Sequence, residues 1–396
     1  MPDPQPVPGT ASDEASRYRR AVEGLLGVPA TEGNTIEVLR NGDEIFPAMI
    51  GAIEASQHTI DFLTYVYWSG EVGKQIAAAL AARARAGVRV RVLLDAIGTA
   101  PMDESLLVDM TDAGAQVERF RPVSARHLGK ADHRTHRKVL ICDEEIGFTG
   151  GVGIADEWMG SARNPNEWRD THFRVRGPAV DGLRAAFVDN WAETTGKLFD
   201  EGIDRFPLQP GDGSSCVQVV RGASEAGPSD IATLVHALLQ LARRHIRITT
   251  AYFVPDPETK DLLCDAARRG VEVELLLPGP HADKRFVQLA GEADYEELLE
   301  AGVKAWYFQP TMLHAKIMTI DGIVANVGSA NFNARSLSLD EEVNMLVLDR
   351  AVVSELNAHF DEDLQRAEPL DLGTWRDRGT VQKLAEKAAG LVDTQF

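Results

Sequence analysis

The 396-residue chain has little cysteine, no long apolar run and a deficit of positive charge. Three cysteines, Cys142, Cys216 and Cys264, are too few for a disulfide framework and form no C-x-x-C pair, so buried thiols in a reducing compartment are expected. No stretch approaches the ~20 apolar residues of a transmembrane helix, and the first residues lack a secretory signal pattern. We expect a cytoplasmic protein, or one held peripherally at the inner face of a membrane.

The charge balance bears on partners. With 41 Lys and Arg against 60 Asp and Glu, the net charge is -19. Such a chain lacks the broad basic face that holds a nucleic acid backbone, which argues against nucleic acid as a partner. An anionic lipid surface would repel it too, unless a local patch compensates. The basic stretch from Arg126 to Arg137 is either that patch or a solvated loop.

Strand-like and helix-like segments alternate along the chain, which predicts an α/β fold with a buried sheet. The pattern occurs twice. In the first half, strand-like segments cover 36–39, 59–67 and 88–94, and helix-like segments cover 44–55 and 73–86. In the second half, strand-like segments cover 217–220, 246–253 and 271–277, and helix-like segments cover 231–242 and 258–268.

The two halves match closely enough to indicate an internal duplication. The strand sequence GVRVRVLL from Gly87 returns as GVEVELLL from Gly270, 183 positions later (270 − 87). A Gly/Pro/Asp-rich stretch between the halves is typical of a linker. We therefore predict a loose N-terminal arm (1–33), a first domain (34–200), a linker (201–215), a second domain (216–372) and a C-terminal helical tail packed on the body (373–396). The halves should pack as two mixed-sheet α/β units about a pseudo-twofold axis, with one active site between them.

Each half contains a His-x-Lys-x4-Asp motif, and the two copies lie 178 positions apart (314 − 136). The apolar run after each lysine predicts a strand, where residues two apart point to the same face, so His and Lys should lie side by side. A glycine-rich segment follows each copy and should let the backbone approach a ligand. The residues are His136, Lys138, Asp143 with Gly150 and Gly151, then His314, Lys316, Asp321 with Gly328, Ser329 and Asn331.

This set suits the cleavage of a phosphodiester. Lysines, hydroxyls and amides can hold the anionic oxygens, and a neutral imidazole can attack phosphorus. A second, protonated imidazole can then protonate the leaving alkoxide. One half offers one histidine, so both halves are needed. We expect no cofactor, and the pair His133 and His136 has too few further ligands to indicate a metal site.

A carboxylate near each imidazole would fix its tautomer. Asp170 follows His136 by 34 positions (170 − 136), and Glu342 follows His314 by 28 (342 − 314). We expect each acid to serve the histidine of its own half. Three tryptophans nearby, Trp158, Trp168 and Trp191, fit core packing better than base stacking.

The doubled motif, with its Gly-Gly and Gly-Ser-x-Asn segments, resembles the phospholipase D superfamily over roughly Thr35 to Trp375. The flanking segments EWRDTHFRVRGPAV and GSANFNARSLSLDEEVN resemble bacterial cardiolipin synthases. The resemblance implies a metal-free, two-step reaction through a phosphohistidine. It implies His136 as nucleophile and His314 as general acid and base, with Asp143 and Asp321 as structural or orienting groups and not as proton carriers. It also implies a phospholipid substrate: with phosphatidylglycerol as donor and acceptor, the product is cardiolipin.

One position departs from that pattern: Gly153 stands where the second half has Asn331, so the first half lacks one phosphate donor. Two rival functions stay open. One is a hydrolase, acting on phospholipids or on nucleic acid. The other is a catalytically impaired lipid-binding protein. Because both half-sites belong to one chain, we expect activity as a monomer.

Overall fold

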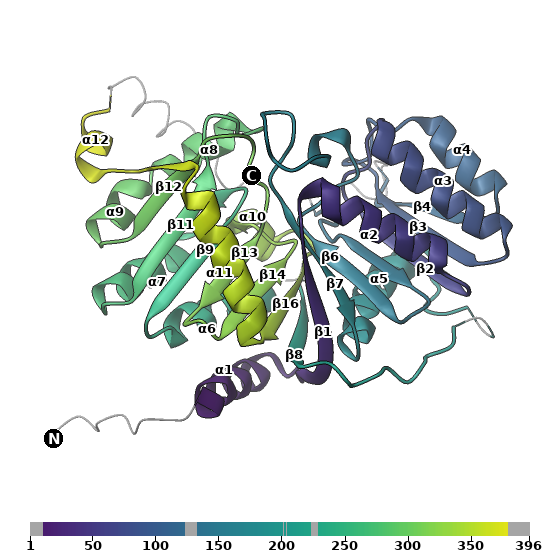
Figure 1. Ribbon diagram of the computed structural model, residues 1–396, viewed down its shortest axis with the longest axis horizontal. Coiled ribbons are helices and arrows are strands. Elements are labelled where there is room, and N and C mark those ends of the chain that lie inside the picture. Colours follow the sequence, from purple (N-terminus) through teal and green to yellow (C-terminus); the bar gives the residue numbers. More distant parts are fainter. Residues whose placement is uncertain (1–10, 123–132, 201, 203, 223–228, 379–396) are drawn as a thin grey trace.

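The computed structural model describes residues 11–122, 133–200, 202, 204–222 and 229–378. Its centre is one mixed sheet in which β1 and β8 pair antiparallel and join the two halves (Figure 1). From one edge to the other the strand order is β17-β12-β11-β9-β13-β14-β16-β8-β1-β7-β6-β5-β2-β3-β4. The halves therefore share a single continuous sheet.

The strand order is the same on both sides of the β1–β8 pair, as a pseudo-twofold axis requires. Counting outward, each first-half strand has a second-half counterpart, and β17 (Ala367–Pro369) is added at one edge. The first-half strands are β1 (Thr31–Arg40), β7 (Thr171–Arg176), β6 (Ile146–Gly150), β5 (Val139–Cys142), β2 (Thr59–Thr64), β3 (Arg89–Asp95) and β4 (Gln116–Phe120). Their counterparts are β8 (Ser215–Arg221), β16 (Val343–Leu348), β14 (Val324–Gly328), β13 (Ile317–Ile320), β9 (His245–Thr249), β11 (Glu272–Pro278) and β12 (Lys304–Phe308).

Helices cover the sheet and build three main cores. One core joins α2 (Asn41–Ala55), α3 (Glu71–Arg85) and α4 (Glu104–Asp112) to first-half strands. A second joins α6 (Asp230–Leu241), α7 (Pro257–Arg268) and α9 (Tyr295–Glu300) to second-half strands. The third spans both halves, because α5 (Ala179–Thr195) and α11 (Arg350–Leu364) contribute to one buried cluster with the central strands. The smaller elements are α8 (Arg285–Glu292), α10 (Ala334–Ser338), α12 (Leu372–Arg376), and the two-stranded β10 (Phe253–Val254) and β15 (Phe332–Asn333).

Local sequence accounts for several of these boundaries. Helix α7 begins after Asp256, whose carboxylate accepts the Thr259 N–H, and Pro257 occupies the first helical turn. Helix α11 begins after Asp349, which accepts the N–H groups of Ala351 and Val352. Each strand-like or helix-like segment expected from the sequence overlaps a described strand or helix of that type, with ends shifted by a few residues.

The N-terminal arm is not loose over its described part. Helix α1 (Ala11–Leu26) packs against α6, and its Tyr18 and Val22 are fully buried in the second-half core. The Tyr18 hydroxyl donates to Asp321 Oδ2 at 2.7 Å. The amphipathic face of this helix, missed behind the Pro-rich start, explains its packing. The basic residues Arg126 to Lys130 and most of the C-terminal tail lie outside the described residues.

No helix in the described ranges is both long and apolar enough to cross a bilayer.

Candidate active site

Two backbone bridges cross between the halves and bring their motifs together. Thr135 pairs with Glu341, and Leu313 pairs with Arg169, both in parallel. The next residues are then fixed: the His136 N–H donates to the Glu341 carbonyl at 2.8 Å, and the His314 N–H donates to the Arg169 carbonyl at 2.7 Å. Each motif is thereby bound to the segment that carries the carboxylate of the opposite half.

The two histidine–carboxylate pairs are crossed between the halves. His136 Nδ1 lies 2.9 Å from Glu342 Oε1, and His314 Nδ1 lies 2.8 Å from Asp170 Oδ2. The expectation that each acid serves the histidine of its own half is wrong. The expectation rested on the distance along the chain from each histidine to the next acid. In the structure, Glu342 follows the bridge residue Glu341, and Asp170 follows the bridge residue Arg169, so each acid lies beside the histidine of the other half.

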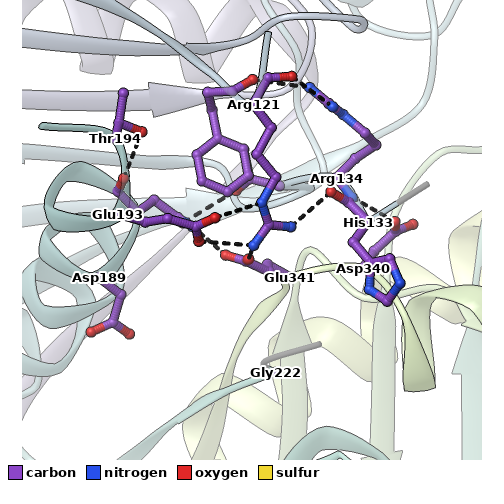
Figure 2. A network of polar contacts seen from close by, with 12 residues as sticks. Arg121, His133, Arg134, Asp189, Glu193, Thr194, Gly222, Asp340 and Glu341 are labelled. Carbon is purple, nitrogen blue, oxygen red and sulfur yellow. Dashed lines mark hydrogen bonds and ion pairs between the residues drawn. The ribbon is translucent and has the colours of Figure 1, made fainter. Parts of the chain in front are cut away.

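Buried ion pairs hold the segments that carry these acids. Figure 2 shows Arg121 between Glu193 and Glu341, to both of which it donates. Arg121 also donates to the His133 carbonyl at 2.8 Å. On the other side, Arg169 Nε donates to Asp363 Oδ2 of α11 at 2.8 Å, with both side chains 2% exposed. Removing one partner would leave a buried charge without a counter-ion, which is strongly destabilising. The pairs therefore hold Glu341 and Arg169 in place, and with them the neighbouring Glu342 and Asp170.

The hydrogen bonds define the tautomers. Nδ1 of His136 faces two acceptors, Glu342 and the Ser329 carbonyl at 3.2 Å, so this nitrogen carries the proton. Nδ1 of His314 faces the Asp170 carboxylate at 2.8 Å, which assigns the proton to this nitrogen; the Lys316 ammonium lies beside the same ring, 3.1 Å from Nδ1 and 3.2 Å from Nε2. In the neutral rings, Nε2 is therefore left with a lone pair on both histidines. That nitrogen can attack phosphorus or exchange a proton with an alcohol.

Burial sets the protonation of the two rings. It lowers the pKa of His136 below its usual range, although Glu342 pulls the other way. Burial, with the nearby Lys316 ammonium, lowers the pKa of His314 to about 4. Burial favours the neutral acids, but His314 holds the pKa of Asp170 below its usual range and His136 does the same for Glu342.

Both motif lysines are buried beside their histidines, each 3% exposed. Lys138 Nζ donates to the His136 carbonyl at 2.8 Å, and Lys316 Nζ donates to the His314 carbonyl at 2.5 Å. Burial lowers the pKa of Lys138 to about 8 and that of Lys316 to about 7. Two partly neutralised ammonium groups so close together form a site that an anion would stabilise.

The site opens into two adjoining cavities that share His136, Tyr65, Tyr252 and Lys284. One, of about 270 Å³, contains His314 and Lys138 and is lined largely by aromatic and apolar groups. The other, of about 260 Å³, is more polar. The first is completed by Val66, Trp68, Ile97, Gly98, Pro101, Trp158, Trp168 and Asp283, and the second by Arg134, Val287, Asn331, Asn333, Arg335, Ser336 and Asp340.

The glycine-rich segments make room for the protein's own side chains, not for a ligand. A Cβ on Gly151 would lie 2.4 Å from Asp170 Oδ1, and one on Gly150 would lie 2.6 Å from His172 Nδ1. In the second half, the fully buried Ser329 donates its hydroxyl to Glu342 Oε2 at 2.5 Å. Ser329 therefore positions a carboxylate. Of the expected phosphate donors there, Asn331 lines the polar cavity, and its Oδ1 is buried without a partner.

The missing asparagine of the first half has a steric explanation. A Cβ on Gly153 would lie 2.7 Å from Val66 Cβ and 3.2 Å from the Trp158 ring. Val66 and Trp158 together leave no room for a side chain there, and Trp158 packs edge-on against His314, with ring centroids 5.0 Å apart. Trp168 also contacts His314 at 5.5 Å. From the sequence, both tryptophans were expected to pack in the core. Their position between the glycine segment and Asp170 is the sequence feature that could have placed them at the site.

The motif aspartates lie away from the histidines, at the far ends of β5 and β13. Asp143 accepts the N–H groups of Gln57, His58 and Thr59. Asp321 accepts those of Arg243, Arg244 and His245, in addition to the Tyr18 hydroxyl. Asp143 holds the loop that leads into β2, and Asp321 holds the loop that leads into β9. Neither aspartate lines either of the two cavities. Within the described ranges, no group of three or more His, Cys, Asp or Glu could hold a metal.

The chain is similar in sequence to known cardiolipin synthases. The family model described as "Cardiolipin synthase, PLD-like domain" matches residues 49–164 and 235–364. Cardiolipin synthase 1 of Bacillus cereus is 32% identical over 389 residues, which cover 96% of this chain and 76% of that protein. The cardiolipin synthase of a Geobacillus species is 35% identical over 92% of this chain and 73% of its own length.

A solved structure shares the fold. The phosphatidylserine synthase of Haemophilus influenzae superposes with a TM-score of 0.68 at 16% identity, covering 96% of this chain and all of the other.

Proposed function

Because this chain belongs to the cardiolipin synthase family of the phospholipase D superfamily, we propose that it moves a phosphatidyl group between phospholipids through a phosphohistidine. It is a phosphatidyltransferase of that superfamily. The observation that carries the proposed chemistry is the crossed pair of dyads, His136–Glu342 and His314–Asp170, around two buried lysines.

In the first step, Nε2 of His136 attacks phosphorus and the bond from phosphorus to the leaving alcohol breaks. Protonated His314 gives its Nε2 proton to that oxygen, and bound phosphate favours this protonation by offsetting the lysine charges. In the second step, His314 takes the proton of an acceptor hydroxyl whose oxygen attacks phosphorus. The P–N bond then breaks and returns His136 as a neutral ring. Glu342 and Asp170 keep both Nδ1–H groups in place.

The acceptor we propose is a second phospholipid rather than water. The cavity that holds His314 is lined by Trp68, Trp158 and Trp168, whose apolar surfaces disfavour a free water beside the intermediate. With phosphatidylglycerol as donor and acceptor the products are cardiolipin and glycerol. The lipid substrate would bring the protein to a membrane surface, and one chain supplies both half-sites, so a monomer should suffice.

The test is a rapid-quench reaction with phosphorus-labelled phosphatidylglycerol vesicles, stopped in alkaline denaturant. Wild type should carry base-stable label on His136, and His136→Ala should carry none. His314→Ala should still become labelled by a p-nitrophenyl phosphodiester, because p-nitrophenolate leaves without a proton. Label-free wild type with activity surviving in His136→Ala contradicts the mechanism.

Product analysis then separates transfer from its rivals. Cardiolipin supports the proposal, phosphatidic acid alone indicates a hydrolase, and lipid binding without turnover indicates a binding protein.

A further inference from the structure

Besides its histidine, each dyad carboxylate accepts a hydrogen bond from a buried, neutral side-chain donor, and Asp170 Oδ1 also accepts the Thr171 N–H at 2.7 Å. In the His136 dyad, the Ser329 hydroxyl donates to Glu342 Oε2, while the imidazole uses Oε1. In the His314 dyad, the indole N–H of Trp158 donates to Asp170 Oδ2 at 2.8 Å. That is the same oxygen that accepts the His314 Nδ1 proton.

The first half cannot use a serine for this purpose. Gly151 occupies the position that matches Ser329, and any Cβ there would collide with the Asp170 carboxylate. The indole reaches the carboxylate from another segment, the short 3₁₀ turn Asp156–Trp158. Trp158 is 2% exposed, and Trp168 packs on its ring with centroids 4.4 Å apart, so its orientation is fixed.

We propose that Trp158 is a positioning residue that takes the place of the absent serine in the first half-site and tunes His314 through Asp170. Its N–H holds Asp170 and competes with His314 for one oxygen. The competition weakens the attraction of the carboxylate for an imidazolium, and so adds to burial and the Lys316 ammonium in keeping the His314 ring neutral at rest. The competing donor is specific to this dyad, because Ser329 binds the other oxygen of Glu342. The role rests on the proposed function only in that His314 carries the proton.

The consequence is measurable on the protein without turnover. In Trp158→Phe, the competing donor is lost while the ring packing stays. The Asp170–His314 hydrogen bond should strengthen, moving the His314 Nδ1–H proton resonance downfield at pH 7. The pKa of His314 should rise by about half a pH unit or more. The His136 Nδ1–H resonance should not move. Signals are assigned by their loss in His314→Gln and His136→Gln, in protein labelled at its 10 histidines.

The matched controls are Trp168→Phe, which alters packing on the same ring, and Trp191→Phe, in the α5 core. Neither should raise the pKa of His314. If Trp158→Phe folds poorly, 3-benzothienylalanine at position 158 keeps the shape and removes only the N–H.

An unchanged His314 signal in either Trp158 variant overturns the proposal, as does an equal change in Trp168→Phe. Because the readout needs no substrate, failure of the transferase proposal would leave it intact, and the reverse also holds.

Discussion

The half-site around His136 and the half-site around His314 use the same parts in different surroundings. The His136 side chain is 14% exposed and borders both cavities, including the polar one. The His314 side chain is 7% exposed, borders only the aromatic cavity and contacts Trp158, Trp168 and Tyr252. Duplication supplied two equivalent histidines, and the neighbours made them unequal. The more exposed His136 is suited to be the nucleophile, and the more buried His314, in the aromatic cavity, is suited to carry the proton.

The largest expected effect breaks the dyads. Glu342→Gln and Asp170→Asn should each lower kcat by about 10³–10⁴, because the orienting acid is lost. They should differ in the step affected. Glu342→Gln should slow labelling of His136 by any substrate, whereas Asp170→Asn should spare labelling by a p-nitrophenyl phosphodiester. Rapid-quench labelling rates measure this difference.

Asp283→Asn is the control for those variants, since Asp283 lines the cavity but binds the Tyr252 hydroxyl and not a histidine. If Asp170→Asn slowed labelling by both substrates equally, the division of roles between the dyads would be refuted.

A smaller effect separates the two lysines by pH. The pKa of Lys316 is lowered to about 7 and that of Lys138 to about 8, so both lose charge as pH rises through this window. Since kcat/KM reports the free enzyme, it should fall by about tenfold per pH unit for each lysine above its pKa. Lys316→Arg should remove the limb near pH 7 and keep the one near pH 8. A kcat/KM flat from pH 6 to 9 in wild type would contradict the assignment.

The smallest effect tests the structural aspartates. Asp321 accepts the Tyr18 hydroxyl, a donor for which Asp143 has no counterpart among its described hydrogen bonds. Tyr18→Phe should lower the free energy of unfolding by about 1 kcal/mol and leave kcat unchanged. Denaturant unfolding measures the first quantity.

The sign of the pH dependence can be worked out for Tyr18→Phe. Burial opposes ionisation of Asp321, yet the Tyr18 and backbone hydrogen bonds lower its pKa below the usual value. A lowered folded pKa means that the stability is present above the unfolded pKa, about 4, and is lost as pH falls through the folded value. The difference between wild type and Tyr18→Phe should therefore be full at pH 7 and shrink below pH 4. A difference that grows on acidification would be inconsistent with this bond.

Much of the fold followed from local pattern. Alternating apolar segments predicted the strands and helices, and the repeated segments beginning at Gly87 and Gly270 predicted the duplication. The domain boundaries stay a prediction, since one sheet runs through both halves. Helix α1 was missed as a packed element because its partner, α6, lies more than 200 residues away in the chain.

The sequence by itself determined the reacting groups, because the motifs name His136 with Lys138 and His314 with Lys316. The expectation that each pair lies on a strand is wrong: both pairs lie in the short segments that lead into β5 and β13. Only the tertiary structure decided which acid serves which histidine, because the Thr135–Glu341 and Leu313–Arg169 bridges join residues more than 140 positions apart. It also decided that Val66 and Trp158 leave no room for a side chain at position 153. Strand periodicity is a local property of the backbone, whereas a hydrogen bond between distant segments depends on how the whole sheet closes around the site.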